Sequence, residues 1–266
     1  MIDQDLSINT DLARRVITGF IRSEVTRQGF SHGVIGLSGG IDSALSCFLA
    51  AEALGPQNVL AVMMPYRTSS PRSLEDAQQV VAATGVQSLV VPISESADAL
   101  IQRFPEMNNM RRGNIMARLR MIVLYDQSSA FNGLVIGTGN KTEILLGYTT
   151  LYGDSACALN PIGDLYKTQV RQLAAAIGMP ASILEKEPTA DLWVGQTDES
   201  ELGFTYDEAD RLLYLLVDQR YTADECVEAG FAEPLVHAVI ERVRRNQFKR
   251  MLPPIAKLSQ RTVGYD

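Results

Sequence analysis

The chain has 266 residues, of which 46% are hydrophobic, and its 31 acidic and 24 basic residues give a formal net charge of −7. This is the composition of a globular protein with a sizeable core, and its acidity argues against nucleic acid as a partner, because phosphate neutralisation needs a basic face. Three scattered cysteines argue against a disulfide framework or a zinc site, and two histidines argue against chemistry built on histidine. No run approaches the length of a membrane span, and the polar N-terminus does not resemble a signal peptide, so we expect no membrane contact and a cytoplasmic protein.

Helical and strand patterns alternate along the first half of the chain. Helices are expected over residues 10–28, 42–54, 71–84 and 115–131, and strands over 33–37, 59–64, 88–91 and 134–136. In the first helix Thr10 is the expected N-cap, and one apolar stripe is expected from Leu12, Val16, Ile17, Phe20 and Ile21. This alternation is typical of an α/β protein with an open parallel sheet and helices on both faces.

The second half of the chain has a different texture. Residues 148–163, rich in Gly, Thr, Asn and Pro, predict a long ordered loop, and residues 166–177 predict a helix. The polar stretch 188–203 predicts a mobile loop suited to a lid. From Thr205 onward the pattern is helical, including residues 234–250. We find no repeat and no interdomain linker, so we expect a single domain over residues 1–266 with a helical C-terminal region.

A glycine-rich segment joins the first expected strand to the second expected helix. It consists of Gly36, Leu37, Ser38, Gly39, Gly40, Ile41, Asp42 and Ser43. Ligands of open parallel sheets collect at such strand ends. Small residues let several backbone N–H groups point at one anion, and the helix dipole and two serine hydroxyls favour it further, which predicts a pyrophosphate site. A Walker A loop would need a lysine that is missing here, and the spacing of a dinucleotide fingerprint is missing too.

The same segment resembles SGGxDS, the PP-loop of the N-type ATP pyrophosphatases, which cleave ATP between its α and β phosphates. A carboxylate beside a polyphosphate suits a hard cation, so Asp42 is expected to bind Mg²⁺. The PP-loop alone leaves several enzymes open, among them GMP, asparagine and argininosuccinate synthetases and tRNA-thiolating enzymes.

A second segment at the same sheet edge narrows this choice. Residues 137–143, Gly-Thr-Gly-Asn-Lys-Thr-Glu, closely resemble the GTxNKxE stretch of NAD synthetases. The resemblance implies that Thr138 contacts ATP and that Glu143 binds Mg²⁺ together with Asp42. A glutamate at a helix start is also favoured by the helix dipole alone. The stretches YGD at 152–154 and KEPTADL at 186–192 continue the match, which covers residues 10–252.

Further roles are implied by the resemblance alone. Lys167 and Thr189 correspond to residues that contact ATP. Separately from the resemblance, backbone at Met63 and Met64, at the end of the second expected strand, is expected at the adenine, although apolar strand ends are ordinarily core. The positions expected at deamido-NAD are Arg118, which the family uses across a dimer interface, Leu151, Ala158, Phe248 and Lys249. Leu151 and Ala158 depart from the pattern of many ammonia-using members, which have Lys and Asp there.

The implied activity is a ligase that amidates the nicotinate carboxylate of deamido-NAD. The carboxylate attacks the α-phosphate of ATP, and ammonia then displaces AMP. The expected catalytic residues are Asp42, Lys167 and Asp154, the last as a candidate base for ammonium. ATP is the expected co-substrate, Mg²⁺ the cofactor and a homodimer the assembly. Three alternatives stay open: a PP-loop amidotransferase acting on another acid, a synthetase subunit fed by a separate glutaminase, and a non-catalytic nucleotide-binding protein.

Overall fold

The computed structural model describes residues 6–189, 191–193, 195–256 and 258. Its centre is a four-stranded sheet of β1 (His32–Gly36), β2 (Val59–Met63), β3 (Gln87–Val90) and β4 (Gly133–Ile136). The spatial order is β3-β2-β1-β4, and every neighbouring pair is parallel. Gly36 pairs with Val62, and Ile35 with Ile136, so the carboxyl ends of three strands meet at one edge. The predicted open parallel sheet is confirmed.

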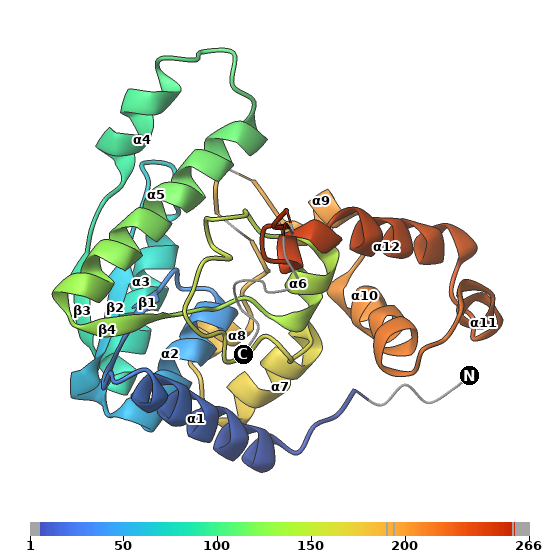
Figure 1. Cartoon of the computed structure of the whole chain (residues 1–266), viewed down its shortest axis with the longest axis horizontal. Helices are drawn as coiled ribbons and strands as arrows, with labels where there is room; N and C mark the ends of the chain where they lie inside the picture. Colours follow the sequence, from blue (N-terminus) through green and yellow to red (C-terminus); the bar gives the residue numbers. More distant parts are fainter. Residues whose placement is uncertain (1–5, 190, 194, 257, 259–266) are drawn as a thin grey trace.

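Helices cover both faces of this sheet (Figure 1). On one side pack α1 (Thr10–Arg27), α2 (Ile41–Leu54), α3 (Pro71–Thr84) and α7 (Lys167–Ala176). On the other side lie α4 (Ser94–Ile101) and α5 (Asn109–Ala130). Side chains alternate between the faces as a strand requires: Ile35 joins the core of the first side, and Val34 the cluster beneath α5.

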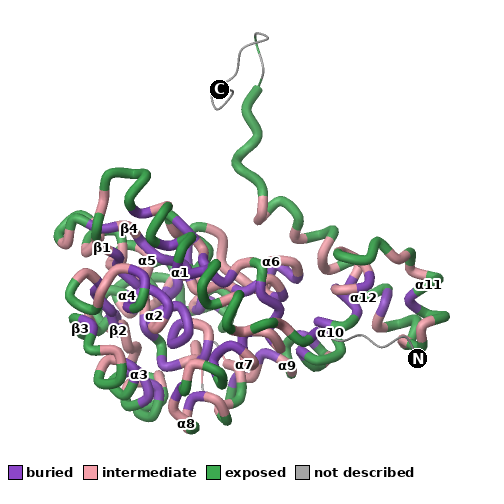
Figure 2. The backbone as a smooth tube through the Cα atoms, turned by 90° about the horizontal axis from the view of Figure 1, so that it is seen from below, coloured by how far each residue is buried: buried purple, intermediate pink, exposed green. Residues whose placement is uncertain are grey.

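The C-terminal part is helical, as predicted, and lies beside the sheet (Figure 1). Its elements are α6 (Lys141–Leu146), α9 (Asp198–Leu202), α10 (Tyr206–Leu213), the π-helical turn η2 (Tyr214–Asp218), α11 (Ala223–Glu228), α12 (Glu233–Arg245) and the 3-10 turn η3 (Gln247–Arg250). The short helix α8 (Ala181–Leu184) instead packs against α2 and α7. A second hydrophobic core joins α6, α10, α11 and α12. After Arg250 the described chain is exposed and runs away from the body (Figure 2). Among the described residues, no helix combines the length and apolar character needed to cross a bilayer.

Some local expectations differ from the structure. The N-cap of α1 is Asn9, whose side chain accepts a hydrogen bond from the Leu12 N–H, and not Thr10. Only part of the predicted stripe of α1 is buried: Ile17 and Ile21 lie in the core, whereas Leu12, Val16 and Phe20 are exposed. Helix α5 begins earlier than predicted because Asn108 caps it. The predicted loop 188–203 contains the short helix α9, and α4 was not predicted.

Candidate active site

The glycine-rich segment forms a tight loop between β1 and α2, with Gly39 in the left-handed region at φ +76°. Its polar groups turn inward: the Ser38 N–H and hydroxyl both meet Ser43 Oγ, at 3.2 and 3.0 Å, and the Gly40 N–H donates to Ser38 Oγ at 3.3 Å. The side chains of Leu37 and Ile41 are buried in the core. The loop therefore gathers two backbone N–H groups and two serine hydroxyls around one point, and these are the donor types that an anion site uses.

Three of the predicted residues form an ion cluster beside this loop. Lys167 Nζ lies 2.6 Å from Asp42 Oδ2 and 3.3 Å from Glu143 Oε1, and its side chain is 3% exposed. Asn140 Nδ2 donates to the other Asp42 oxygen at 2.8 Å. The first turns of α2, α6 and α7 supply the three charged groups, so residues more than a hundred positions apart in the chain meet at one point.

A capping box fixes the orientation of Glu143. The Asn140 side chain accepts from the Glu143 N–H, and Glu143 Oε2 accepts from the Asn140 N–H at 3.2 Å. This leaves Oε1 to face Lys167. The single glutamate therefore serves as a helix cap through one oxygen and as part of the ion cluster through the other.

Burial and the neighbouring charges shift the pKa values of the groups in this cluster. Burial, and then the Asp42 carboxylate, raise the pKa of Glu143 above its usual range against the opposing charge of Lys167. Burial alone would lower the pKa of Lys167, but Asp42 and Glu143 outweigh it and raise that pKa, so the lysine is charged. Two acids placed in this way could hold Mg²⁺, which commonly takes one or two carboxylates and completes its shell with phosphate oxygens and water. Within the described residues, no group of three or more metal-ligating side chains accompanies them.

Two buried aspartates support this cluster and were not predicted. Asp198, 4% exposed, accepts from the hydroxyls of Tyr206 at 3.0 Å and Tyr148 at 3.2 Å, and Lys167 Nζ lies 5.0 Å from the centre of the Tyr206 ring. Burial raises the pKa of Asp198, and the nearby charge of Lys167 opposes this. The acidic stretch that contains Asp198 was a sequence signal for it, although without a role for this residue.

Asp210 is the second of these aspartates, and it is fully buried. It accepts from the Thr142 hydroxyl at 2.5 Å and from the Thr168 N–H at 2.8 Å. Thr142 also accepts from the Lys167 N–H at 3.0 Å. Asp210 therefore ties the start of α6 to the start of α7, the two turns that carry Glu143 and Lys167. No local pattern in the sequence marks it.

The turn after α6 gathers most of the positions expected at deamido-NAD. Arg118 donates through Nε and a terminal nitrogen to the Leu151 carbonyl, at 3.3 and 3.2 Å, and Lys249 Nζ donates to the carbonyls of Gly147 and Thr149. Phe248 is exposed beside Lys249. Ala158 is exposed too and lies on the loop that follows, where its N–H bonds to β4.

Asp154 belongs to the same turn and accepts from the Thr150 N–H at 2.8 Å. The residue as a whole is exposed, yet desolvation of its carboxylate by the surrounding chain raises its pKa, against the hydrogen bonds from Thr150 and the charge of Lys249. A carboxylate whose pKa is raised in this way is a better proton acceptor than an ordinary aspartate.

The other residues expected to contact ATP are Met63, Thr138 and Thr189, and they are not part of the ion cluster. The Met63 side chain is buried in the core and its carbonyl already accepts from the Val91 N–H. Thr138 is half-buried at the end of β4. The Thr189 hydroxyl donates to the Gln196 carbonyl at 2.7 Å.

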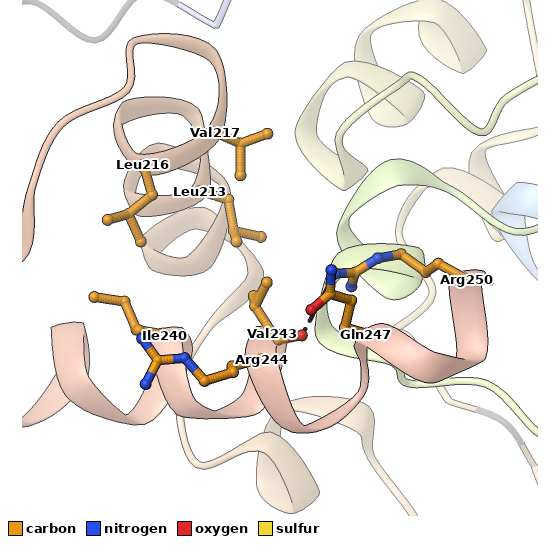
Figure 3. A pocket seen from close by; sticks show the side chains of 8 residues that line it. All are labelled: Leu213, Leu216, Val217, Ile240, Val243, Arg244, Gln247 and Arg250. Atoms are coloured by element: carbon orange, nitrogen blue, oxygen red, sulfur yellow. Dashed lines mark hydrogen bonds between the residues drawn. The ribbon is translucent and has the colours of Figure 1, made fainter.

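A separate hollow opens between α10 with η2 and α12 (Figure 3). Aliphatic side chains from the two sides face one another. Gln247 and Arg250 lie together at one end, and Arg244 lies beside Ile240. It includes none of the predicted ATP or deamido-NAD positions, and its lining consists of Leu213, Leu216, Val217, Ile240, Val243, Arg244, Gln247 and Arg250.

The parallel sheet, the loop at the end of β1 and the acid pair across from it define an α/β nucleotide-binding protein of the PP-loop ATP pyrophosphatase superfamily. Within it, the NAD synthase family matches residues 13–253. The chain belongs to the NAD synthase family.

Individual relatives agree with this assignment. The chain is 59% identical to an NH(3)-dependent NAD(+) synthetase of Trichlorobacter lovleyi, over 98% of this chain and 96% of the relative. Among solved structures it is similar to an NH3-dependent NAD synthetase from Campylobacter jejuni, with a TM-score of 0.81 and 34% identity over 94% of this chain and 100% of that one. It is also similar to an NMN synthetase from Francisella tularensis, with a TM-score of 0.84 and 30% identity over 95% and 100%.

Proposed function

We propose that this chain forms NAD from deamido-NAD, ATP and ammonia, and releases AMP and pyrophosphate. The observation that carries the proposal is the cluster of Asp42, Lys167 and Glu143 at the inward-facing loop. The near-full-length identity to a relative named for ammonia-dependent NAD synthesis supports the choice of substrate.

The chemistry needs alignment and charge neutralisation rather than a nucleophile from the protein. An oxygen of the nicotinate carboxylate attacks the α-phosphorus, and the bond to the β-phosphate oxygen breaks, giving an acyl adenylate and pyrophosphate. Ammonia then adds to the acyl carbon, loses a proton, and AMP leaves with the former carboxylate oxygen.

This chain's own groups divide those tasks. The loop from Gly36 to Ser43 holds the leaving pyrophosphate, and Lys167 neutralises charge that develops on the phosphates. Asp42 and Glu143 would hold Mg²⁺, which supplies further charge neutralisation at the polyphosphate when bound. Asp154 accepts a proton from ammonium, and its raised pKa suits that task.

The proposal also covers the assembly, the cellular location and the nitrogen source. Arg118, Ile122 and Tyr125 lie exposed at helical spacing on α5, which supports a homodimer built across this helix with Arg118 reaching the partner's ligand. We place the enzyme in the cytoplasm and treat free ammonia as its nitrogen source, with a separate glutaminase as the alternative supply.

The test is a reaction of the purified chain with Mg-ATP and deamido-NAD, with ammonium or glutamine as nitrogen donor. Pyrophosphate and NAD formed with ammonium would support the proposal. Pyrophosphate without NAD would point to a missing nitrogen-delivering partner. Absence of pyrophosphate under both conditions would refute deamido-NAD as the substrate, and the corresponding mononucleotide acid would be tried next, because one similar structure is of an NMN synthetase.

A further inference from the structure

Lys186 lies against the phosphate loop, in the segment that follows α8. Its ammonium group donates to the Gly39 carbonyl at 3.3 Å, to Ser73 Oγ at 3.1 Å and to Asp76 Oδ2 at 3.0 Å. The side chain of Asp76 is 2% exposed and that of Lys186 is 17% exposed, so the ion pair is largely withdrawn from water. Withdrawing an ammonium group from water costs free energy, so the contacts that Lys186 makes must offset that cost.

Helix α3 supports the loop at the same point. A Cβ on Gly39 would lie 2.2 Å from the Ser73 carbonyl oxygen, and the φ of Gly39 is +76°, so the loop rests directly on the helix and a side chain does not fit. The segment that carries Lys186 contacts α3 a second time through Asp191, which accepts from the Ser70 N–H at 3.0 Å and from Ser73 Oγ at 3.1 Å. The loop, the first turns of α3 and this segment therefore form one junction.

The bond to the Gly39 carbonyl sets the direction of the next amide. In a trans peptide the C=O and N–H point in opposite directions, and the described chain contains no cis peptide. Holding the Gly39 oxygen toward Lys186 therefore turns the Gly40 N–H away from it, and that N–H donates to Ser38 Oγ at 3.3 Å. The Gly40 N–H is thereby kept on the side of the loop where the Ser38 and Ser43 hydroxyls meet, which is the side where we expect an anion to bind.

We propose that Lys186 is a positioning residue, which holds the Gly39–Gly40 peptide in the orientation that binds the pyrophosphate part of ATP. The inference rests on the proposed function only in that the loop binds pyrophosphate, and not on the identity of the acid substrate. Without this bond a peptide between two glycines is free to turn its N–H outward. One lost hydrogen bond to a charged acceptor weakens pyrophosphate binding roughly tenfold or more.

A simpler role for Lys186 would be to neutralise Asp76. Removing Lys186 alone would mix the two roles, because an unpaired buried carboxylate destabilises the fold and repels an anion. The double variant Lys186→Met with Asp76→Asn removes both charges and keeps the net charge of the junction, so it lacks the bond to Gly39 without gaining an unpaired acid. The matched control is Arg22→Met, since Arg22 Nε donates to the Ala53 carbonyl at 3.0 Å at the far end of α2.

Calorimetric titration of Mg-pyrophosphate into the full-length wild type and both variants tests the inference directly. Steady-state kinetics with ATP and deamido-NAD add a readout that a general loss of stability would not produce. In the double variant we expect the Kd of pyrophosphate and the KM of ATP to rise about tenfold or more, with the KM of deamido-NAD changing less than about twofold. The control should match the wild type in each.

Wild-type pyrophosphate affinity in the double variant would overturn the inference, as would an equal loss in Arg22→Met or a wild type that binds no pyrophosphate. NAD formation by the wild type is scored separately. A wild type that binds pyrophosphate but forms no NAD refutes the proposed substrate, while the comparison of variants still decides the role of Lys186.

Discussion

Replacing Lys167 by Met removes a cation that two carboxylates share. Lys167 Nζ lies 2.6 Å from Asp42 Oδ2 and 3.3 Å from Glu143 Oε1, and the variant leaves these two acids facing one another. Deleting one partner of a buried ion pair costs about 3–5 kcal/mol. Both carboxylates keep 16% exposure, so we take the lower end, about 3 kcal/mol, which lowers the Tm of a chain of this size by roughly 6–12 °C.

The loss should depend on Mg²⁺ and on pH. Two acids without a counter-ion attract a divalent cation more strongly, so Mg²⁺ should raise the Tm of the variant more than that of the wild type. The pKa of Glu143 is raised in the fold, so protonated Glu143 stabilises the native state below its ordinary pKa, and this contribution is lost as the pH rises through the raised pKa. The penalty of Lys167→Met should therefore be smaller in a mildly acidic buffer than in a mildly alkaline one.

Thermal unfolding of both proteins with and without Mg²⁺, in each buffer, measures these effects, and pyrophosphate release measures the loss of turnover. Lys141→Met is the matched control, because Lys141 also contacts two acids, Asp164 at 3.1 Å and Asp218 at 2.9 Å, but Asp164 is 96% exposed. Lys141→Met should lower the free energy of unfolding by about 1 kcal/mol or less and leave the effect of Mg²⁺ on Tm unchanged. Equal Tm values for Lys167→Met and wild type without Mg²⁺ would refute the ion cluster.

Four further substitutions test the site and the elements around it. Gly39→Ala places a Cβ 2.2 Å from a carbonyl oxygen of α3 at a φ of +76° and should cost roughly 1–3 kcal/mol in chemical unfolding. Gly19→Ala, on α1 with nothing within 4 Å of the new Cβ, should instead raise the free energy of unfolding by roughly 0.5–1 kcal/mol. A Gly39→Ala variant more stable than Gly19→Ala would contradict the geometry. Asp210→Ala leaves two buried donors unpaired, so it should lower the free energy of unfolding by roughly 1–3 kcal/mol and lower kcat. An unchanged kcat would mean that activity does not depend on the contacts by which Asp210 joins α6 to α7. Asp154→Asn should lower turnover at limiting ammonium about a hundredfold. Desolvation raises the pKa of Asp154. As the buffer is acidified, the wild-type rate should therefore begin to fall at a higher pH than it would with an ordinary aspartate. The pH–rate profile of Asp154→Asn should lack this fall.

The parts of the site that could be predicted from the sequence are those that local rules place. The glycines and serines of the phosphate loop stand between a strand and a helix start, and parallel strand ends meet at one edge, so the loop and the start of α6 had to lie together. Glu143 shows why two interpretations of one residue need not compete. Its Oε2 caps α6 and its Oε1 faces Lys167, so the helix-start preference and the ion cluster use different atoms.

The parts that could not be predicted depend on contacts between distant segments. Asp210 meets Thr142 across 68 positions, and Lys186 meets Gly39 across 147. Neither contact leaves a periodicity or a spacing in the sequence. Helix α1 illustrates the same limit for packing: its apolar residues are spaced for a helix, but the covering partner alone decides that Ile17 is buried and Val16 is exposed.

The helical C-terminal region holds the site in place rather than only flanking it. The last carbonyls of a helix have no partner within it, and in α6 side chains from the end of α12 and from η3 supply the donors. Arg250 donates to the Leu145 carbonyl at 2.7 Å, and Asn246 to that of Leu146 at 3.1 Å. Asp210 of α10 anchors the other end of the same helix through Thr142. Glu143 lies between these two anchors, so the acid that faces Lys167 is positioned by chain that follows it by more than sixty residues, and the sheet and the helical region cannot be separated without losing the ion cluster.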